Sequence, residues 1–160
     1  MQKIEIRTRR MTLHPMTDAE IENLIACTDS DELRTAYGEM LDGCRRDPKN
    51  RIWYAPWAMA LHENQAYIGD IDFKGPAQNH AVEIGYGVLP EYEGNGYTTE
   101  ALRAMAKWAF EQPNVACVEA ETAPDNDASQ RVLAKCGFVR CGNGEEGPLF
   151  SLTQVPACSH

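Results

Sequence analysis

Residues Glu83 to Glu100 read EIGYGVLPEYEGNGYTTE and join a predicted strand to a predicted helix. The strand ends at Pro90, because proline has no N–H to donate to a neighbouring strand. Side chains alternate between the two faces of a strand, so Glu83, Gly85 and Gly87 share one face. Two glycines beside a carboxylate leave a lane of bare backbone there. The lane indicates the close approach of a ligand, or else a β-bulge or a tightly overlaid helix.

A turn, Gly94-Asn95-Gly96, then leads directly into the helix. Backbone N–H groups at such a turn, together with the helix N-terminus, form an anion site for which a diphosphate is the expected ligand. Ordinary strand-to-helix turns also use glycine, so the turn alone does not establish a phosphate site. The chain lacks the Gly-Lys-Ser/Thr of a P-loop, and Thr99 stands where the dinucleotide fingerprint has a third glycine or alanine. Both of those nucleotide-binding classes are therefore disfavoured.

The rest of the sequence predicts a single mixed α/β domain over residues 1–160. Thr17 and Glu20 have capping-box spacing, which indicates the start of a helix, and Asp47-Pro48 ends the next one. This order of elements favours a largely antiparallel sheet flanked by helices. The predicted strands cover 3–13, 53–61, 66–73, 81–89, 115–120, 138–141 and 149–153, and the predicted helices begin near residues 18 and 31 and cover 97–112 and 125–136.

Composition narrows the function classes. The chain has 160 residues with 24 acidic and 15 basic side chains, a net charge of −9, which argues against binding to nucleic acid or an anionic membrane. No apolar run is long enough to cross a bilayer, and the charged N-terminus does not look like a secretory signal. The six cysteines form no C-x-x-C pair and the four histidines are scattered, so we expect no metal site and a reducing, cytoplasmic environment.

Two motifs resemble the GNAT superfamily of acetyl-CoA-dependent N-acetyltransferases, in the branch of the ribosomal-protein alanine N-acetyltransferases. One is Gly-Tyr-x-Thr-Glu-Ala over 96–101, and the other is Asn126-x-x-Ser129 followed by VLAKCGF over 132–138. The similarity covers most of the chain. The family's phosphate-loop pattern, Gln/Arg-x-x-Gly-x-Gly/Ala, is matched at Gly96, whereas Glu93 replaces Gln/Arg and Thr98 replaces the last small residue.

The resemblance implies that the pantetheine arm of acetyl-CoA inserts between two splayed parallel strands, one ending at Leu89 and one starting at Val115. It further implies that backbone N–H groups near Val88 hold the thioester. The backbone N–H groups of Gly94 to Thr99 would hold the pyrophosphate, although Glu93 places a carboxylate nearby. Arg103, Arg131 and Lys135 can balance that charge, or can simply be solvated. The implied cofactor-binding residues are Val88, Leu89, Gly94, Asn95, Gly96, Tyr97, Thr98, Thr99 and Asn126.

The implied reaction is direct attack of a neutral amine on the thioester, which needs a base and a proton for the thiolate. Glu83 is the expected base, directly or through water, unless it is only a structural carboxylate. Leu133 occupies the position of the tyrosine that many family members use as the acid, so Ser129 is the expected substitute, or else a first-turn helix serine. Cys117 and Cys136 lack a clear activating histidine, which disfavours an acyl-cysteine intermediate.

The acceptor site is predicted from aromatic and acidic residues: Tyr37, Trp53, Trp57, Glu145 and Glu146. Equally, the aromatic residues can belong to the core and the two acids to a solvated hairpin. The acceptor is expected to be a protein N-terminus or a small amine. The alternative function is a non-catalytic acyl-CoA-binding sensor module. Family sheets often associate into homodimers, although nothing in this sequence requires a dimer.

Overall fold

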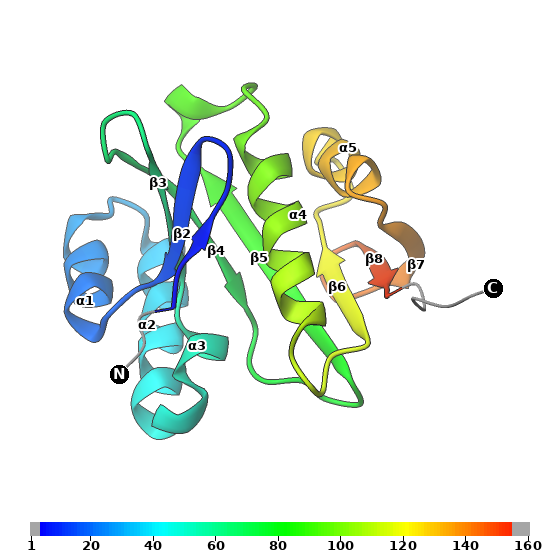
Figure 1. The fold of residues 1–160 in the computed structure, drawn as a ribbon, viewed down its shortest axis with the longest axis horizontal. Helices are drawn as coiled ribbons and strands as arrows, with labels where there is room; N and C mark the ends of the chain where they lie inside the picture. Colours follow the sequence, from blue (N-terminus) through cyan, green and yellow to red (C-terminus); the bar gives the residue numbers. More distant parts are fainter. Residues whose placement is uncertain (1–3, 155–160) are drawn as a thin grey trace.

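The computed structural model describes residues 4–154, which form one eight-stranded sheet with flanking helices (Figure 1). The strand order is β1-β2-β3-β4-β5-β6-β8-β7, and every neighbouring pair is antiparallel except β5 with β6. The predicted largely antiparallel α/β architecture is confirmed.

The elements are β1 (Ile6–Arg7), β2 (Met11–Pro15), α1 (Asp18–Cys27), α2 (Asp31–Arg46), η1 (Pro48–Asn50), α3 (Arg51–Tyr54), β3 (Trp57–Leu61), β4 (Tyr67–Phe73), β5 (Ala81–Val88), η2 (Pro90–Tyr92), α4 (Tyr97–Phe110), β6 (Cys117–Glu121), α5 (Asp127–Lys135), β7 (Val139–Asn143) and β8 (Pro148–Thr153).

The predicted first strand over 3–13 is, in its described part, a hairpin of β1 and β2. The chain reverses between them, where the Thr8 N–H donates to the Met11 carbonyl at 2.8 Å and the Thr8 hydroxyl contacts the same turn. A threonine side chain that bonds to nearby backbone competes with a continuous strand. This local bonding explains why one predicted strand becomes two.

The predicted strand over 53–61 also starts differently, because its first residues belong to the short helix α3. Ala55 is already extended, with φ −72° and ψ 145°, since the residue before a proline is driven out of the helical region. Pro56 therefore separates α3 from β3. The other predicted elements from 97 to 153 differ from the observed ones by at most two residues at either end.

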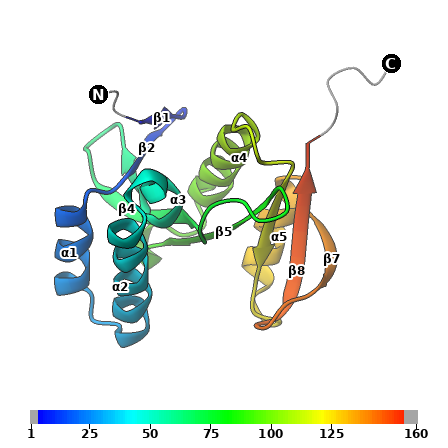
Figure 2. The ribbon, with the colours of Figure 1, turned by 90° about the horizontal axis from the view of Figure 1, so that it is seen from below.

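Side chains on β3 alternate between two hydrophobic cores. Trp57 and Met59 face the larger core, where they meet Leu102 and other residues of α4. Ala58 faces the smaller core, together with Leu41 of α2. Accordingly α1 and α2 lie on one side of the sheet and α4 on the other (Figure 2). No helix in residues 4–154 is long and apolar enough to cross a membrane.

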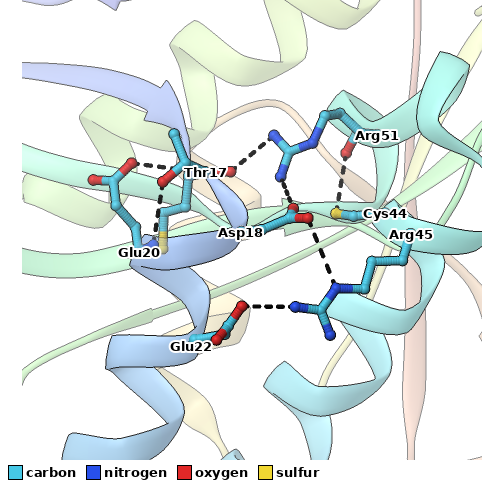
Figure 3. A network of polar contacts seen from close by, with 8 residues as sticks. Thr17, Asp18, Glu20, Glu22, Cys44, Arg45 and Arg51 are labelled. Carbon is cyan, nitrogen blue, oxygen red and sulfur yellow. Dashed lines mark hydrogen bonds and ion pairs between the residues drawn. The ribbon is translucent and has the colours of Figure 1, made fainter.

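A polar network joins α1, α2 and α3 (Figure 3). Asp18 pairs with Arg51 at 2.6 Å and with Arg45 at 3.8 Å, and Arg45 also pairs with Glu22 at 2.6 Å. The predicted capping box is present at the start of α1. The ion pairs therefore fasten α2, the helix that carries Tyr37, to α1, and α1 to α3.

Candidate active site

The sheet opens between its two parallel strands. β5 pairs with β6 only through Ala81–Glu83 and Cys117–Glu119. Beyond Glu83, β5 continues alongside β4, whereas β6 continues alongside β8. The two strands therefore diverge toward their carboxyl ends, as the family resemblance implies, and leave a gap in the hydrogen-bond ladder.

The backbone of Val88 faces this gap. In an antiparallel pair, consecutive residues direct their N–H and C=O groups to opposite sides. The Leu89 N–H donates to the Ile68 carbonyl of the β4 side at 2.8 Å. It follows that the polar groups of Val88 point the other way, toward the diverging β6. These groups are available to a ligand inserted between the strands.

The glycine turn (Gly94-Asn95-Gly96) presents a row of free donors. Gly96 has φ 79° and is the N-cap of α4, with no side chain capping the first turn. Within residues 4–154, none of the six backbone N–H groups from Gly94 to Thr99 donates a hydrogen bond. The Asn95 side chain instead bonds the carbonyls of Tyr92 and Glu93, which fixes the turn. This arrangement fits an anion at a helix N-terminus.

A cavity of about 250 Å³ lies between the glycine turn and α5. Two cations, Arg131 and Lys135, line it together with Thr98 and Thr99. Glu93 also borders the cavity, but it is exposed to solvent. The cations supply the positive charge that the glycine turn lacks in its own sequence. Arg103, the third candidate, donates to the Lys135 carbonyl at 2.8 Å and thereby joins α4 to α5.

The β1–β2 hairpin holds the glycine turn from the other side. We call Thr8, Arg10 and Glu100 the hairpin clamp. The Glu100 carboxylate accepts from the Thr8 hydroxyl at 2.6 Å, the Arg10 N–H at 2.9 Å and the Arg10 Nε at 2.8 Å. Arg10 also donates to the Asn95 carbonyl at 2.9 Å and lies over the Tyr97 ring. These bonds lower the pKa of Glu100 against the effect of its partial burial. Sequence reasoning missed the clamp, because its partners are about 90 residues apart.

A pair of hydroxyl groups lies beside the strand gap. Tyr86 of β5 and Ser129 of α5 are 2.9 Å apart between their oxygens. Burial raises the pKa of the Tyr86 phenol, so it stays protonated at neutral pH. Asn126 caps α5 by accepting from the Ser129 N–H at 3.1 Å, and its side-chain N–H groups donate to no residue between 4 and 154. Leu133 is fully buried. Sequence reasoning selected Ser129 but treated Tyr86 only as a strand residue, although a lone hydroxyl among apolar neighbours was a usable signal.

The face of the sheet that carries the glycine lane (Gly85 and Gly87) is lined by carboxylates. Asp72 lies opposite Gly85 and Asp70 opposite Gly87, so these side chains share a face with the lane. Glu83 lies on the same face, where the Lys74 ammonium is 3.5 Å from its carboxylate. We call Asp70, Asp72 and Glu83 the carboxylate face.

Asp70 is held by two tyrosines. Its Oδ2 accepts from the Tyr37 hydroxyl at 2.7 Å and from the Tyr67 hydroxyl. Burial and the adjacent carboxylate raise the pKa of both phenols, which remain donors. A β-bulge between β3 and β4 lets Tyr67 reach the same side of the sheet as Asp70. Tyr37 is therefore a buried support for this face, with 6% of its surface exposed, and not an open wall of a binding site.

Trp53 and Trp57 do not join this face, which corrects the prediction that they line the acceptor site with Tyr37. Trp57 is fully buried, and the Trp53 and Trp57 rings pack at steep angles against Trp108 of α4, with centroids 5.2 and 5.0 Å away. Trp57 belongs to the larger core because β3 directs alternate side chains to opposite faces, and Trp53 of α3 is partly buried against the same core. Burial in that core leaves Trp57 no surface to offer a substrate.

Glu145 and Glu146 are exposed in the loop between β7 and β8. The Glu146 N–H donates to the Glu121 carboxylate at 2.7 Å. Because Glu121 is the last residue of β6, the loop lies at the open end of the strand gap. Within the described residues, no group of His, Cys, Asp and Glu side chains has the arrangement of a metal site.

Comparisons with known proteins agree with this geometry. Residues 10–139 match the model of the acetyltransferase (GNAT) domain. The Bacillus subtilis protein YoaA, described as an uncharacterized N-acetyltransferase, is 29% identical over 148 residues, which cover 86% of this chain and 84% of YoaA.

Solved structures share the fold at low sequence identity. The ribosomal-protein-S5-alanine acetyltransferase of Vibrio fischeri has a TM-score of 0.74 at 18% identity, over 94% of this chain and 96% of that one. Mycobacterium smegmatis RimJ in complex with CoA-disulfide has a TM-score of 0.73 at 19% identity, over 94% and 88%. The aminoglycoside acetyltransferase AAC(6')-Ib in complex with coenzyme A has a TM-score of 0.66 at 19% identity, over 90% and 95%. Since the family match spans most of its length and the fold agrees, this chain belongs to the GNAT family of acetyltransferases.

Proposed function

We propose that this protein transfers the acetyl group of acetyl-CoA to a primary amine by direct attack within a ternary complex. The observation that carries the proposal is the row of unpaired N–H groups at the glycine turn, placed beside the diverging strands β5 and β6. The N–H groups provide donors for a diphosphate. The diverging strands provide an opening for the pantetheine arm. Their combination fits the two ends of one coenzyme A molecule.

The residues present fit this cosubstrate. The N–H groups of the glycine turn would hold the pyrophosphate, with Arg131 and Lys135 adding positive charge at the same cavity. Val88 would hold the pantetheine side through its backbone, and Asn126 through its free amide. When bound, acetyl-CoA supplies an acetyl group activated as a thioester. The proposed cofactor-binding residues are Val88, Leu89, Gly94, Asn95, Gly96, Tyr97, Thr98, Thr99 and Asn126.

The chain also offers groups for both proton transfers. The Tyr86–Ser129 hydroxyl pair borders the gap and would protonate the leaving thiolate, with Tyr86 as the direct donor or through Ser129. The carboxylate face would take the proton from the amine. Burial raises the pKa of the Cys136 thiol, and its S–H donates a hydrogen bond to the Thr99 carbonyl, so an acyl-cysteine route is disfavoured.

The acceptor is proposed to be an amine that is positively charged before reaction. Structural neighbours are described as acting on protein N-termini (RimL) and on aminoglycosides (AAC(6')-Ib), both of which carry such amines. Here Asp70, Asp72 and Glu83 lie on one face of the sheet, and the loop with Glu145 and Glu146 lies at the open end of the gap. Negative charge in these places favours a cation.

The test has two stages. Calorimetric titration with acetyl-CoA and with CoA measures binding, for which we expect micromolar affinity or better. Thiol release is then measured with alanine- and serine-initiated tetrapeptides and with 1,4-diaminobutane as acceptors. Absence of binding would overturn the proposal. Binding without thiol release on a broad panel of amines would favour the sensor module, which the departures at Glu93 and Thr98 motivate.

A further inference from the structure

Asp72 differs from every other carboxylate near the strand gap. Its side chain is only 6% exposed, yet it forms no hydrogen bond or ion pair with any residue from 4 to 154. No side-chain oxygen in that range is both sealed from solvent and unpaired, so the Asp72 oxygens still touch solvent. A buried carboxylate without a partner is costly unless something else meets it.

The open side of Asp72 is the glycine lane. Its Oδ1 lies 3.4 Å from the position that a Cβ on Gly85 would take, so only the missing side chain leaves room above it. Gly87, the next lane residue, has nothing within 4 Å of the same position. The lane therefore forms a path along β5 that leads from Asp72 toward the backbone groups of Val88.

The neighbouring carboxylates are already engaged. Asp70 accepts from two phenols, which use one of its oxygens. Glu83 lies 3.5 Å from Lys74 and is about one-third exposed. Asp72, opposite Gly85, is also two residues closer to Val88 than Glu83 is, a difference of about 6.6 Å along a strand. Of the three carboxylates, Asp72 is the free one.

We propose that Asp72 is the carboxylate that binds the ammonium group of the acceptor and takes its proton, directly or through water, while Glu83 and Lys74 form a flanking pair. The inference rests on the proposed function and replaces Glu83 as the expected base. It also implies that the acceptor reaches the gap along the glycine lane, from the side of the sheet that α2 covers.

The proton balance is complete without a further reactant. One ammonium proton passes to Asp72 and then to solvent, which leaves a neutral amine. The amine nitrogen forms the N–C bond to the acetyl carbon as the C–S bond breaks. The nitrogen then loses its second proton to the regenerated Asp72 carboxylate, and the Tyr86–Ser129 pair gives a proton to the sulfur and is reprotonated from solvent, giving an amide and free CoA thiol.

The charges that face Asp72 set its pH response. Burial is the main cause that raises the pKa of Asp72, the Asp70 and Glu83 carboxylates raise it as well and Lys74 lowers it, and together they bring it to about 7. The base form therefore prevails above neutral pH, and we expect kcat/KM to fall as the pH drops through about 7. Replacing Asp70 or Glu83 removes a negative charge, so it should move this acid limb to lower pH without abolishing it.

The deciding experiment compares pH–rate profiles of wild type, Asp72→Asn and Glu83→Gln with an alanine-initiated tetrapeptide and with 1,4-diaminobutane. Asp72→Asn should lower kcat/KM at pH 8 by about 100-fold or more and remove the acid limb. In Glu83→Gln, kcat/KM should still fall as the pH decreases, but the fall should occur at a lower pH than in wild type. Acetyl-CoA affinity, measured by calorimetry, should be unchanged in both variants, which shows that they are folded.

A second variant does not alter any carboxylate. Gly85→Ala adds a methyl group at ordinary contact distance from Asp72 and Lys74, so the fold should tolerate it. The methyl group covers Asp72 and should raise KM for the amine while leaving acetyl-CoA affinity unchanged. An unaltered KM would overturn the lane as the path of the acceptor.

The remaining outcomes separate the inference from the proposed function. If wild type transfers acetyl groups while Asp72→Asn keeps its rate and its acid limb, the role of Asp72 is wrong and the transferase proposal stands. Carboxyl-carbon NMR of the CoA complex gives a readout without turnover, with the Asp72 resonance assigned by its loss in Asp72→Asn. That resonance should shift when 1,4-diaminobutane is added. No turnover together with no shift would overturn both proposals.

Discussion

The glycine turn and the carboxylate face solve two recognition problems in different ways. The turn and the first residues of α4 offer main-chain N–H groups from six consecutive residues, Gly94 to Thr99, and the shape of the turn depends on glycine at a positive φ. The carboxylate face depends on side chains from α2, β4 and β5, for example Tyr37 with Asp70, which are 33 residues apart. Backbone recognition tolerates side-chain changes such as Glu93, whereas a face built from ionised side chains does not. We therefore expect larger effects from single changes on the carboxylate face.

The largest expected effect concerns stability on the carboxylate face. Because burial raises the pKa of Asp72 to about 7, the native state binds a proton that the unfolded state releases at lower pH. Stability contributed by protonated Asp72 is present at about pH 4 and is lost as the pH rises to about 7. Asp72→Asn should therefore be more stable than wild type at pH 8, by a few kcal/mol in order of magnitude, and equal to it near pH 4.

Urea unfolding at both pH values measures this difference. The matched control is Asp125→Asn, because Asp125 is exposed and keeps its hydration in the folded state. Equal stabilisation of both variants, or none at pH 8, would show that the buried, ionised Asp72 carboxylate does not destabilise the folded protein.

The next largest effect is expected on kcat, from the Tyr86–Ser129 pair beside the strand gap. Tyr86→Phe removes the phenol that pairs with Ser129 beside the strand gap. If this phenol protonates the thiolate, kcat should fall by about 100-fold while acetyl-CoA affinity is kept. Steady-state thiol release and calorimetry measure the two quantities. Ser129→Ala is the companion variant and should have a smaller effect, since Tyr86 remains a donor; the reverse order would make Ser129 the direct acid.

A smaller effect is expected at the glycine turn. Gly96→Ala places a Cβ at φ 79°, in a left-handed conformation that costs about 1–2 kcal/mol. The strain distorts the donors at the start of α4, so acetyl-CoA affinity should fall by about tenfold. Gly137→Ala is the matched control, because Gly137 also has a positive φ, 87°, but lies at the other end of α5 from the cap residue Asn126. A similar affinity loss in both variants would refute backbone recognition at the turn.

The smallest effect concerns the hairpin clamp. Glu100→Gln keeps the shape of the side chain but weakens its charge-assisted bonds to Thr8 and Arg10. Because Arg10 also holds the Asn95 carbonyl, the turn should become less well ordered. We expect acetyl-CoA affinity to fall by about threefold, as for a loss of roughly 0.7 kcal/mol. If both the acetyl-CoA affinity and the thermal stability are unchanged, the hairpin clamp does not order the glycine turn.

Local patterns predicted the helices and most strands because their causes are local. The capping box at Thr17 and Glu20 begins α1, as predicted from its spacing. The predicted strand over 53–61 was wrong at its start because Pro56, a signal present in the sequence, ends a short helix there. The hairpin at Thr8 was missed because its turn depends on a side chain bonding to nearby backbone.

The candidate site shows where such reasoning stops. Periodicity cannot tell on which side of the sheet an aromatic residue lies, so Tyr37, Trp53 and Trp57 were grouped although Trp57 belongs to the opposite core. Sequence reasoning does not select Asp70 or Asp72, because alternation along a strand does not show whether a helix covers that face. Their burial depends on α2 covering that face, and Tyr37 comes from that helix.

From residues 83–138 alone, the glycine lane, the glycine turn and the family resemblance follow, because each depends on neighbours within a few positions and on backbone conformations that glycine favours. The pairing of Tyr37 with Asp70, of Glu100 with Arg10, and of Tyr86 with Ser129 depends on the folded chain. Each joins elements far apart in the sequence, and only the strand order and the packing of α2, α4 and α5 bring their polar atoms within hydrogen-bond distance. The same packing withdraws Asp72 from water while the lane leaves it one open side, and no local pattern contains that information.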